Sequence, residues 1–182
     1  REESFHLCLT EAITYADEIG VPQLNCLAGV RPEGASALDC TQTLLRNLRH
    51  AAQAAGDAGI AINLEALNSS DVPRYLVATS SYALHILEQV QSPNLRLQYD
   101  WYHMHVMGDD LAATTRNLLP HIGHIQFADA PGRHEPGTGT IDFPPLFRLL
   151  DEIGYPGWVS AEYRPSMETG KTLGWLSKKV KL

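Results

Sequence analysis

Residues 61–68 read Ala-Ile-Asn-Leu-Glu-Ala-Leu-Asn, an apolar run that ends in the carboxylate of Glu65. Three later apolar runs end similarly, at Asp100 in Leu-Arg-Leu-Gln-Tyr-Asp-Trp, at Gln126 in His-Ile-Gln-Phe-Ala and at Glu162 in Trp-Val-Ser-Ala-Glu-Tyr. An unpaired buried carboxylate is costly unless something binds it. We therefore expect these four side chains to form one site at the carboxyl edge of a parallel barrel, the face on which barrel enzymes carry their chemistry.

Helices and strands alternate along the chain, as the spacing of apolar residues indicates. Strands are predicted near 23–28, 60–66, 95–100, 122–128 and 157–162, and helices over about 2–19, 36–56, 76–91, 109–119 and 143–153. Asp109 and Asp142 are expected to cap the last two helices. Because neighbouring parallel strands need a crossover, usually a helix, this alternation predicts an α/β fold with a parallel sheet.

A helix-to-strand junction recurs in the sequence. Residues 17–22, Asp-Glu-Ile-Gly-Val-Pro, are matched by residues 151–156, Asp-Glu-Ile-Gly-Tyr-Pro, and a third version is Gly-Asp-Ala-Gly-Ile at residues 56–60. Glycine ends a helix readily and proline cannot continue one, so each junction is predicted to close a helix. A TIM-type (β/α)8 barrel has eight strands and typically about 250 residues. We interpret residues 1–182 as a single barrel domain with about five C-terminal βα units, its first three strands or so being absent.

Composition narrows the possible partners. The 182 residues are 44% hydrophobic and 19% charged, with a net charge of −7, which argues against a nucleic-acid backbone or an anionic membrane as partner. No apolar run reaches the ~18 residues of a membrane helix. The three cysteines show no Cys-x-x-Cys spacing, so we expect reduced thiols and a cytoplasmic protein.

The four strand-end side chains have the chemistry of a metal site. Three carboxylates and one amide carbonyl make an all-oxygen ligand set, which suits Mg²⁺ or Mn²⁺ better than zinc. Structural alternatives exist for each residue. Glu65 and Glu162 could be paired to loops, Asp100 could cap the following turn, and Gln126 could bond to backbone.

Two motifs carry a resemblance to a known family. His103 follows Asp100 by three residues, and residues 133–139 read Arg-His-Glu-Pro-Gly-Thr-Gly after Gln126. With Glu65 and Glu162, this order resembles the hydroxypyruvate isomerase family, within the xylose-isomerase-like barrel superfamily. The resemblance implies that Glu65, Asp100, Gln126 and Glu162 ligate a divalent metal and that both glutamates also transfer protons. Related ketose epimerases carry His where Gln126 stands, so this position fits the isomerase branch.

The resemblance also implies a substrate and a reaction. The enzyme would be an intramolecular oxidoreductase of carbohydrate and glyoxylate metabolism, converting hydroxypyruvate to tartronate semialdehyde through an enediolate. Arg133 could bind the substrate carboxylate by a bidentate pair, and His103 and His134 are further substrate-binding candidates. Glu135 is expected to be solvated or a loop anchor.

Other functions remain open at this point. A 2-oxo-tetronate isomerase, a ketose 3-epimerase or a phosphate-cleaving endonuclease could use the same scaffold. A nuclease, however, would be expected to have more histidine metal ligands and a basic groove, and neither is evident. A catalytically inactive truncated product is the non-enzymatic alternative. Unpaired edge strands would favour homo-oligomers.

Overall fold

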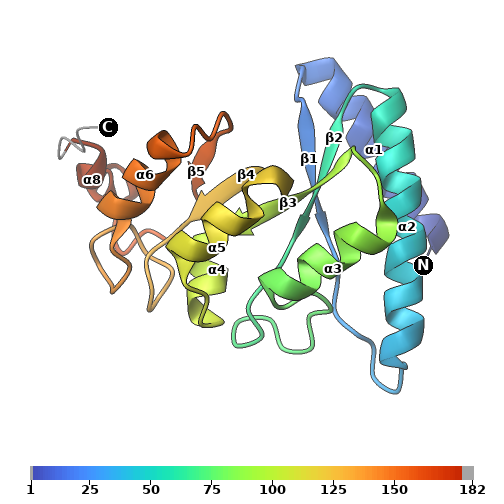
Figure 1. Ribbon diagram of the computed structural model, residues 1–182, viewed down its shortest axis with the longest axis horizontal. Helices are drawn as coiled ribbons and strands as arrows, with labels where there is room; N and C mark the ends of the chain where they lie inside the picture. The colour runs from blue at the N-terminus through green and yellow to red at the C-terminus, as the bar shows by residue number, and fades with distance from the viewer. Residues whose placement is uncertain (1, 178–182) are drawn as a thin grey trace. The chain divides into compact units, whose positions relative to one another are not determined.

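The computed structural model describes residues 2–177 (Figure 1). In chain order its elements are α1 (Glu2–Ile19), β1 (Gln23–Leu27), α2 (Ala37–Asp57), β2 (Ala61–Glu65), α3 (Ser80–Val90), β3 (Leu95–Asp100), α4 (Trp101–Val106), α5 (Leu111–Leu118), the 3-10 helix η1 (Leu119–His121), β4 (Ile122–Phe127), α6 (Phe143–Glu152), β5 (Val159–Ala161), α7 (Thr169–Thr172) and α8 (Gly174–Ser177). The strands follow the order β1-β2-β3-β4-β5 in one sheet. The pairs β1–β2, β2–β3 and β4–β5 are parallel, which confirms the predicted α/β fold with five parallel strands.

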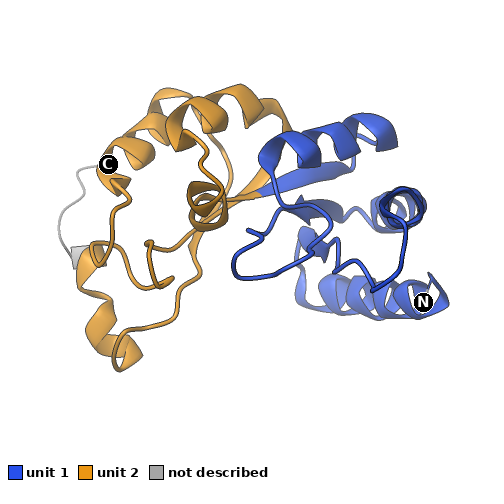
Figure 2. Ribbon diagram, turned by 90° about the horizontal axis from the view of Figure 1, so that it is seen from below, with its two compact units in different colours: residues 1–98 blue, residues 99–182 orange. Residues whose placement is uncertain are grey.

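The chain divides into two compact units, residues 1–98 and 99–182 (Figure 2). In the first unit, α2 contacts α1, α3 and β2. The apolar face of α2 supplies much of the core, and Leu48 on this face has no exposed surface. Burying a leucine side chain of this kind contributes about 1.5–3 kcal/mol. Leu27 lies opposite Glu65 in the β1–β2 register, and Glu65 lies opposite Gln98 in the β2–β3 register, so Glu65 stands at the carboxyl edge of these strands.

The second unit has an aromatic core. Phe127 of β4 packs against Trp101, Phe143 and Phe147, with ring centroids 5.3–6.3 Å apart. Trp101 is fully buried, and its indole Nε1 donates a hydrogen bond to Thr115 Oγ1 at 3.1 Å, which satisfies the polar atom of this large side chain. The core therefore fixes β4 against α4, α5 and α6.

The recurring junctions end helices as predicted. Gly20, Gly59 and Gly154 have φ values of +70°, +72° and +66°, in the left-handed region that glycine enters without a steric cost. The chain can thus reverse direction after α1, α2 and α6.

At the helix starts, the prediction for Asp109 was wrong and the prediction for Asp142 was confirmed only in position. Asp110, not Asp109, caps α5 by accepting from Ala113 N at 3.0 Å, and Asp109 instead accepts from the Tyr99 hydroxyl at 3.1 Å. Asp142 occupies the N-cap position of α6, but its side chain makes no capping hydrogen bond. The short helix α4 was not predicted.

The three cysteines, Cys8, Cys26 and Cys40, are free. Burial raises the pKa of the Cys26 thiol to about 11, so this thiol is protonated at neutral pH. Among residues 2–177, no helix combines the length and apolar character needed to span a membrane.

Candidate active site

Glu65 is the last residue of β2 and is buried. Asn25 Nδ2, on the neighbouring strand β1, donates to Glu65 Oε2 at 2.6 Å. The hydroxyl of Tyr75 donates to the backbone carbonyl of Glu65 at 3.3 Å and itself accepts from Ala28 N at 2.8 Å. These contacts fix the end of β2 and orient one carboxylate oxygen of Glu65.

Asp100 is the last residue of β3 and has no exposed surface. Its Oδ1 accepts from Tyr102 N at 2.8 Å, so Asp100 caps α4. This is the structural role that the sequence analysis gave as the alternative to a metal-ligand role. Its Oδ2 lies 3.7 Å from His103 Nε2 and 3.8 Å from Arg133 Nη2. One oxygen thus orders the helix start while the other faces two potential cations.

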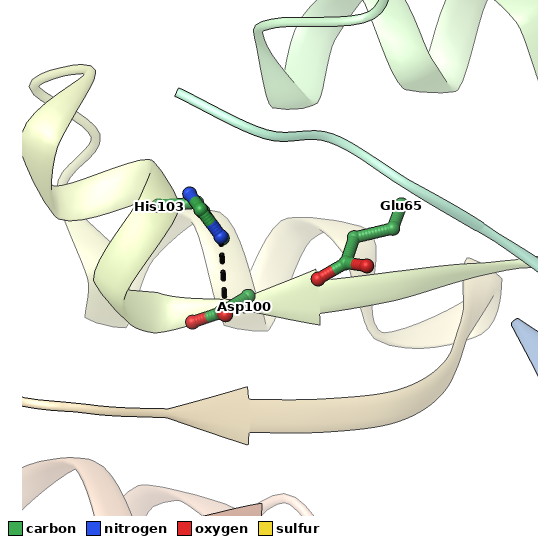
Figure 3. A group of neighbouring side chains, drawn as sticks. All are labelled: Glu65, Asp100 and His103. Carbon is green, nitrogen blue, oxygen red and sulfur yellow. Dashed lines mark ion pairs between the residues drawn. The ribbon is translucent and has the colours of Figure 1, made fainter. Parts of the chain in front are cut away.

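The Asp-x-x-His spacing explains why His103 faces Asp100. Residues three apart lie on the same face of a helix turn, and α4 begins directly after Asp100. Figure 3 shows the two side chains turned toward one another, with a dashed line for a pair that is ionic only when the imidazole is protonated. His103 is 1% exposed, so its ring is held within the protein.

Arg133 connects the loop after β4 to the segment after β5. Its Nη2 donates to Glu162 Oε2 at 2.6 Å, and its guanidinium lies 5.4 Å from the centroid of the Tyr102 ring. The Glu162 amide donates to Phe127 O at 2.9 Å, which continues the β4–β5 pairing to the site. We call Asp100, His103, Arg133 and Glu162 the Asp100 cluster, since the contacts above link all four.

The other two predicted site residues lie on β4 and in the loop that follows it. Gln126 lies on β4 opposite Ser160, one residue before the strand ends, and is half-buried. His134 Nδ1 lies 2.7 Å from the Arg164 carbonyl oxygen, so that ring nitrogen is occupied by backbone. The ligand role of Gln126 and the substrate role of His134 stay predictions.

Glu135 is a loop anchor. It is buried, and its carboxylate accepts hydrogen bonds from the amide and the hydroxyl of Ser166. These bonds, the hydroxyl first, hold the pKa of Glu135 below its ordinary value. Glu135 therefore ties the loop after β4 to the segment after β5.

The Glu135 pair predicts a pH-dependent stability. Because the folded-state pKa is lowered, the stabilisation is present above the ordinary glutamate pKa and is lost as the pH falls through the folded-state pKa. Ser166→Ala is expected to lower the melting temperature at pH 7, and its difference from wild type should narrow in acid. Thermal melts between pH 3 and 7 measure this. Ser81→Ala, at an exposed hydroxyl that contacts Thr79 rather than a carboxylate, is the control. A difference that does not change with pH would contradict the prediction.

Two residues that contribute to the structure of the site were not identified from the sequence. Tyr102 was not singled out, but its ring lies against the guanidinium of Arg133. Asp129, directly after β4, was not singled out, although it is fully buried and accepts several backbone hydrogen bonds. Its only sequence signal is a carboxylate that precedes the Pro-Gly and Gly-rich loop.

Several of these residues could hold a metal ion. Asp100 and His103 of the second unit are buried and each offers one ligand atom, and Glu65 of the first unit is a buried carboxylate that offers another (Figure 3). A buried carboxylate is stabilised by a cation or by hydrogen-bond donors, so the chemistry of each of these residues fits a metal ligand.

Comparison with known proteins places this architecture in a family. The family model for the xylose isomerase-like TIM barrel matches residues 1–179. The chain is 38% identical to 2-oxo-tetronate isomerase of Cupriavidus necator and 39% identical to hydroxypyruvate isomerase of Escherichia coli, in each case over 97% of this chain and 68% of the relative. The crystal structure of AP endonuclease, family 2, from Brucella melitensis superposes with a TM-score of 0.93 at 32% identity, covering 98% of this chain and 69% of that one. The chain therefore belongs to the xylose isomerase-like TIM barrel family, and it spans about two thirds of the length of these relatives.

Proposed function

We propose that the protein is an isomerase that interconverts hydroxypyruvate and 2-hydroxy-3-oxopropanoate, also called tartronate semialdehyde. The observation that carries this proposal is the Asp100 cluster, which combines acid–base carboxylates with a guanidinium. The Escherichia coli and Cupriavidus necator relatives, both named as isomerases of small oxo acids, support the reaction class. A cytoplasmic location and self-association are part of the same proposal.

We propose Glu65, Asp100, Gln126 and Glu162 as the ligands of one divalent cation. Three carboxylates and the guanidinium of Arg133 together carry a formal charge of −2, which a divalent cation balances. The oxygen donors favour Mg²⁺ or Mn²⁺. A bound cation of this kind supplies Lewis-acid polarisation of the substrate carbonyl and of the adjacent hydroxyl.

The two glutamates are the proposed proton carriers. One carboxylate removes a proton from C3 of hydroxypyruvate and a proton is returned to C2, while the hydroxyl proton moves from O3 to O2. The carbonyl thereby shifts from C2 to C3 through an enediolate, with no external oxidant or reductant. General acid–base steps of this type contribute about 10²–10⁴-fold, and either Glu65 or Glu162 can be the base.

Arg133 and His103 are the proposed substrate-binding groups. A guanidinium has five N–H donors, so Arg133 can retain its bond to Glu162 and still bind a substrate carboxylate along another edge. His103 can donate a hydrogen bond to a substrate oxygen from within the protein. His134 is proposed to contact the substrate through its other ring nitrogen, Nε2.

The Arg133→Lys variant tests the substrate class. An ammonium cannot form two parallel hydrogen bonds, so the KM for hydroxypyruvate is expected to rise roughly tenfold, with little change for a neutral ketose. Steady-state kinetics of the full-length protein with Mg²⁺ or Mn²⁺ on hydroxypyruvate, 2-oxo-tetronate and a ketose give the comparison. Arg116→Lys, at an exposed arginine paired with Glu152, is the matched control.

Three outcomes would change the assignment. Equal losses on acid and ketose would make Arg133 a support for its loop. Preferred turnover of neutral ketoses by wild type would favour a ketose 3-epimerase, and preferred turnover of 2-oxo-tetronate would favour the activity of the Cupriavidus necator relative.

A further inference from the structure

The loop between β4 and α6, residues 129–141, is folded around a single side chain. Asp129 Oδ1 accepts from Ala130 N at 2.9 Å and from Ile141 N at 3.1 Å. Its Oδ2 accepts from Gly137 N at 2.8 Å and from Gly139 N at 2.9 Å. Asp129 has no exposed surface, so four backbone amides from both ends of the loop converge on one buried carboxylate. Such an arrangement satisfies the charge and the amides together.

Backbone contacts make the same loop compact. Asp129 N donates to His134 O at 2.8 Å, and Thr140 N donates to Ala130 O at 2.7 Å. A Cβ atom at Gly139 would collide with Ala130 O and with the Asp129 carboxylate, so this close approach requires glycine. The fold of the loop is thus built to admit the Asp129 side chain.

Arg133 lies within this loop in a costly conformation. Its φ is +57°, a left-handed value that a non-glycine residue adopts only when its surroundings hold it there. The Arg133 carbonyl accepts from Arg164 N at 2.7 Å, and its side chain reaches Glu162. The direction of the guanidinium therefore depends on the loop being closed.

We propose that Asp129 is a positioning residue that holds residues 129–141 in the conformation in which Arg133 reaches Glu162. Through Arg133 it also sets how the enzyme binds a substrate carboxylate, and this second step rests on the proposed function. Asp129 itself touches no reacting atom. Its role is to keep four amides in place and, with them, the backbone of Arg133.

A carboxylate is required for this role. Asparagine has the same shape but offers one oxygen acceptor and an NH₂ donor. In Asp129→Asn the NH₂ group would face two backbone N–H groups, so two hydrogen bonds would be lost and like donors brought together.

Asp129→Asn in the full-length protein is the test, with two readouts. The amides of Gly137, Gly139 and Ile141 are expected to exchange with solvent roughly tenfold faster than in wild type, because the loop opens locally. The KM for hydroxypyruvate should rise by about as much as in Arg133→Lys, with a smaller fall in kcat, since misplacing a binding group weakens substrate binding.

A double variant separates positioning from general structural support. In an Arg133→Lys background, Asp129→Asn should change KM by less than about twofold, because the guanidinium that it positions is already gone. Exchange of the loop amides should still accelerate. The control is Asp110→Asn, which alters another carboxylate that accepts a backbone amide in the same unit and should leave both readouts unchanged.

If Asp129→Asn does not fold, Gly137→Ala replaces it. Gly137 has a φ of +92° and donates to Asp129, so alanine strains the same anchor from the loop side. Two results would overturn the proposal. One is unchanged exchange of the loop amides in the Asp129 or Gly137 variant, and the other is a double variant whose KM increase equals the product of the two single-variant increases. If amide exchange is faster in Asp129→Asn but the KM for hydroxypyruvate is unchanged in Arg133→Lys, the proposed substrate class is contradicted. The role of Asp129 in the loop is then still upheld.

Discussion

Replacing either Glu65 or Glu162 with glutamine is expected to lower kcat by roughly a hundredfold or more while leaving the fold intact. A glutamine carbonyl still offers an oxygen to a metal, but the amide cannot take up a proton at neutral pH. In Glu65→Gln the amide oxygen can also accept from Asn25, which preserves the hydrogen bond at the end of β2. The loss should therefore fall on proton transfer rather than on stability.

Steady-state kcat and circular dichroism on the full-length variants measure this effect. Glu152→Gln changes an exposed glutamate paired with Arg116 and should retain wild-type kcat. Near-normal kcat in both site variants would rule out proton transfer by either glutamate. If only one of the two variants keeps a near-normal kcat, proton transfer is assigned to the other glutamate.

Much of the fold could be predicted from local patterns of apolar and turn residues. The five strands were predicted within about two residues of their observed bounds because each is a short apolar run between turn residues. The proximity of His103 to Asp100 was not predicted, because it depends on the short helix α4, whose first turn returns a side chain to the same face after three residues.

The loop contacts could not be predicted in the same way. Glu135 and Ser166 are 31 positions apart, and Arg133 and Glu162 are 29 apart, so no periodicity links them. Asp129 acts on amides between one and twelve residues ahead, which requires the loop to be closed already. The error at Asp109 has a similar cause, because two adjacent aspartates can each cap a helix and tertiary contact with Tyr99 decides between them.

Asp100→Ala is expected to abolish the stabilisation of the full-length protein by Mn²⁺ or Mg²⁺. A metal at a hundred times its Kd stabilises the folded state by about 2.7 kcal/mol, which raises the melting temperature by several degrees. Asp100 is fully buried at the end of β3, with one oxygen directed to His103 and Arg133. Removing its carboxylate takes away a proposed ligand and leaves Arg133 to offset the charge of Glu162 alone.

The readout is the difference in melting temperature with and without metal, so a change in the metal-free protein does not obscure it. Asp110→Ala is the matched control, because Asp110 also caps a helix through its carboxylate but lies at the start of α5. Both variants lose a cap worth about 1 kcal/mol. Only Asp100→Ala should lose the response to metal. If metal raises the melting temperature equally in the two variants, Asp100 is excluded as a ligand. Its buried carboxylate would then have a structural role only, capping α4 and orienting His103.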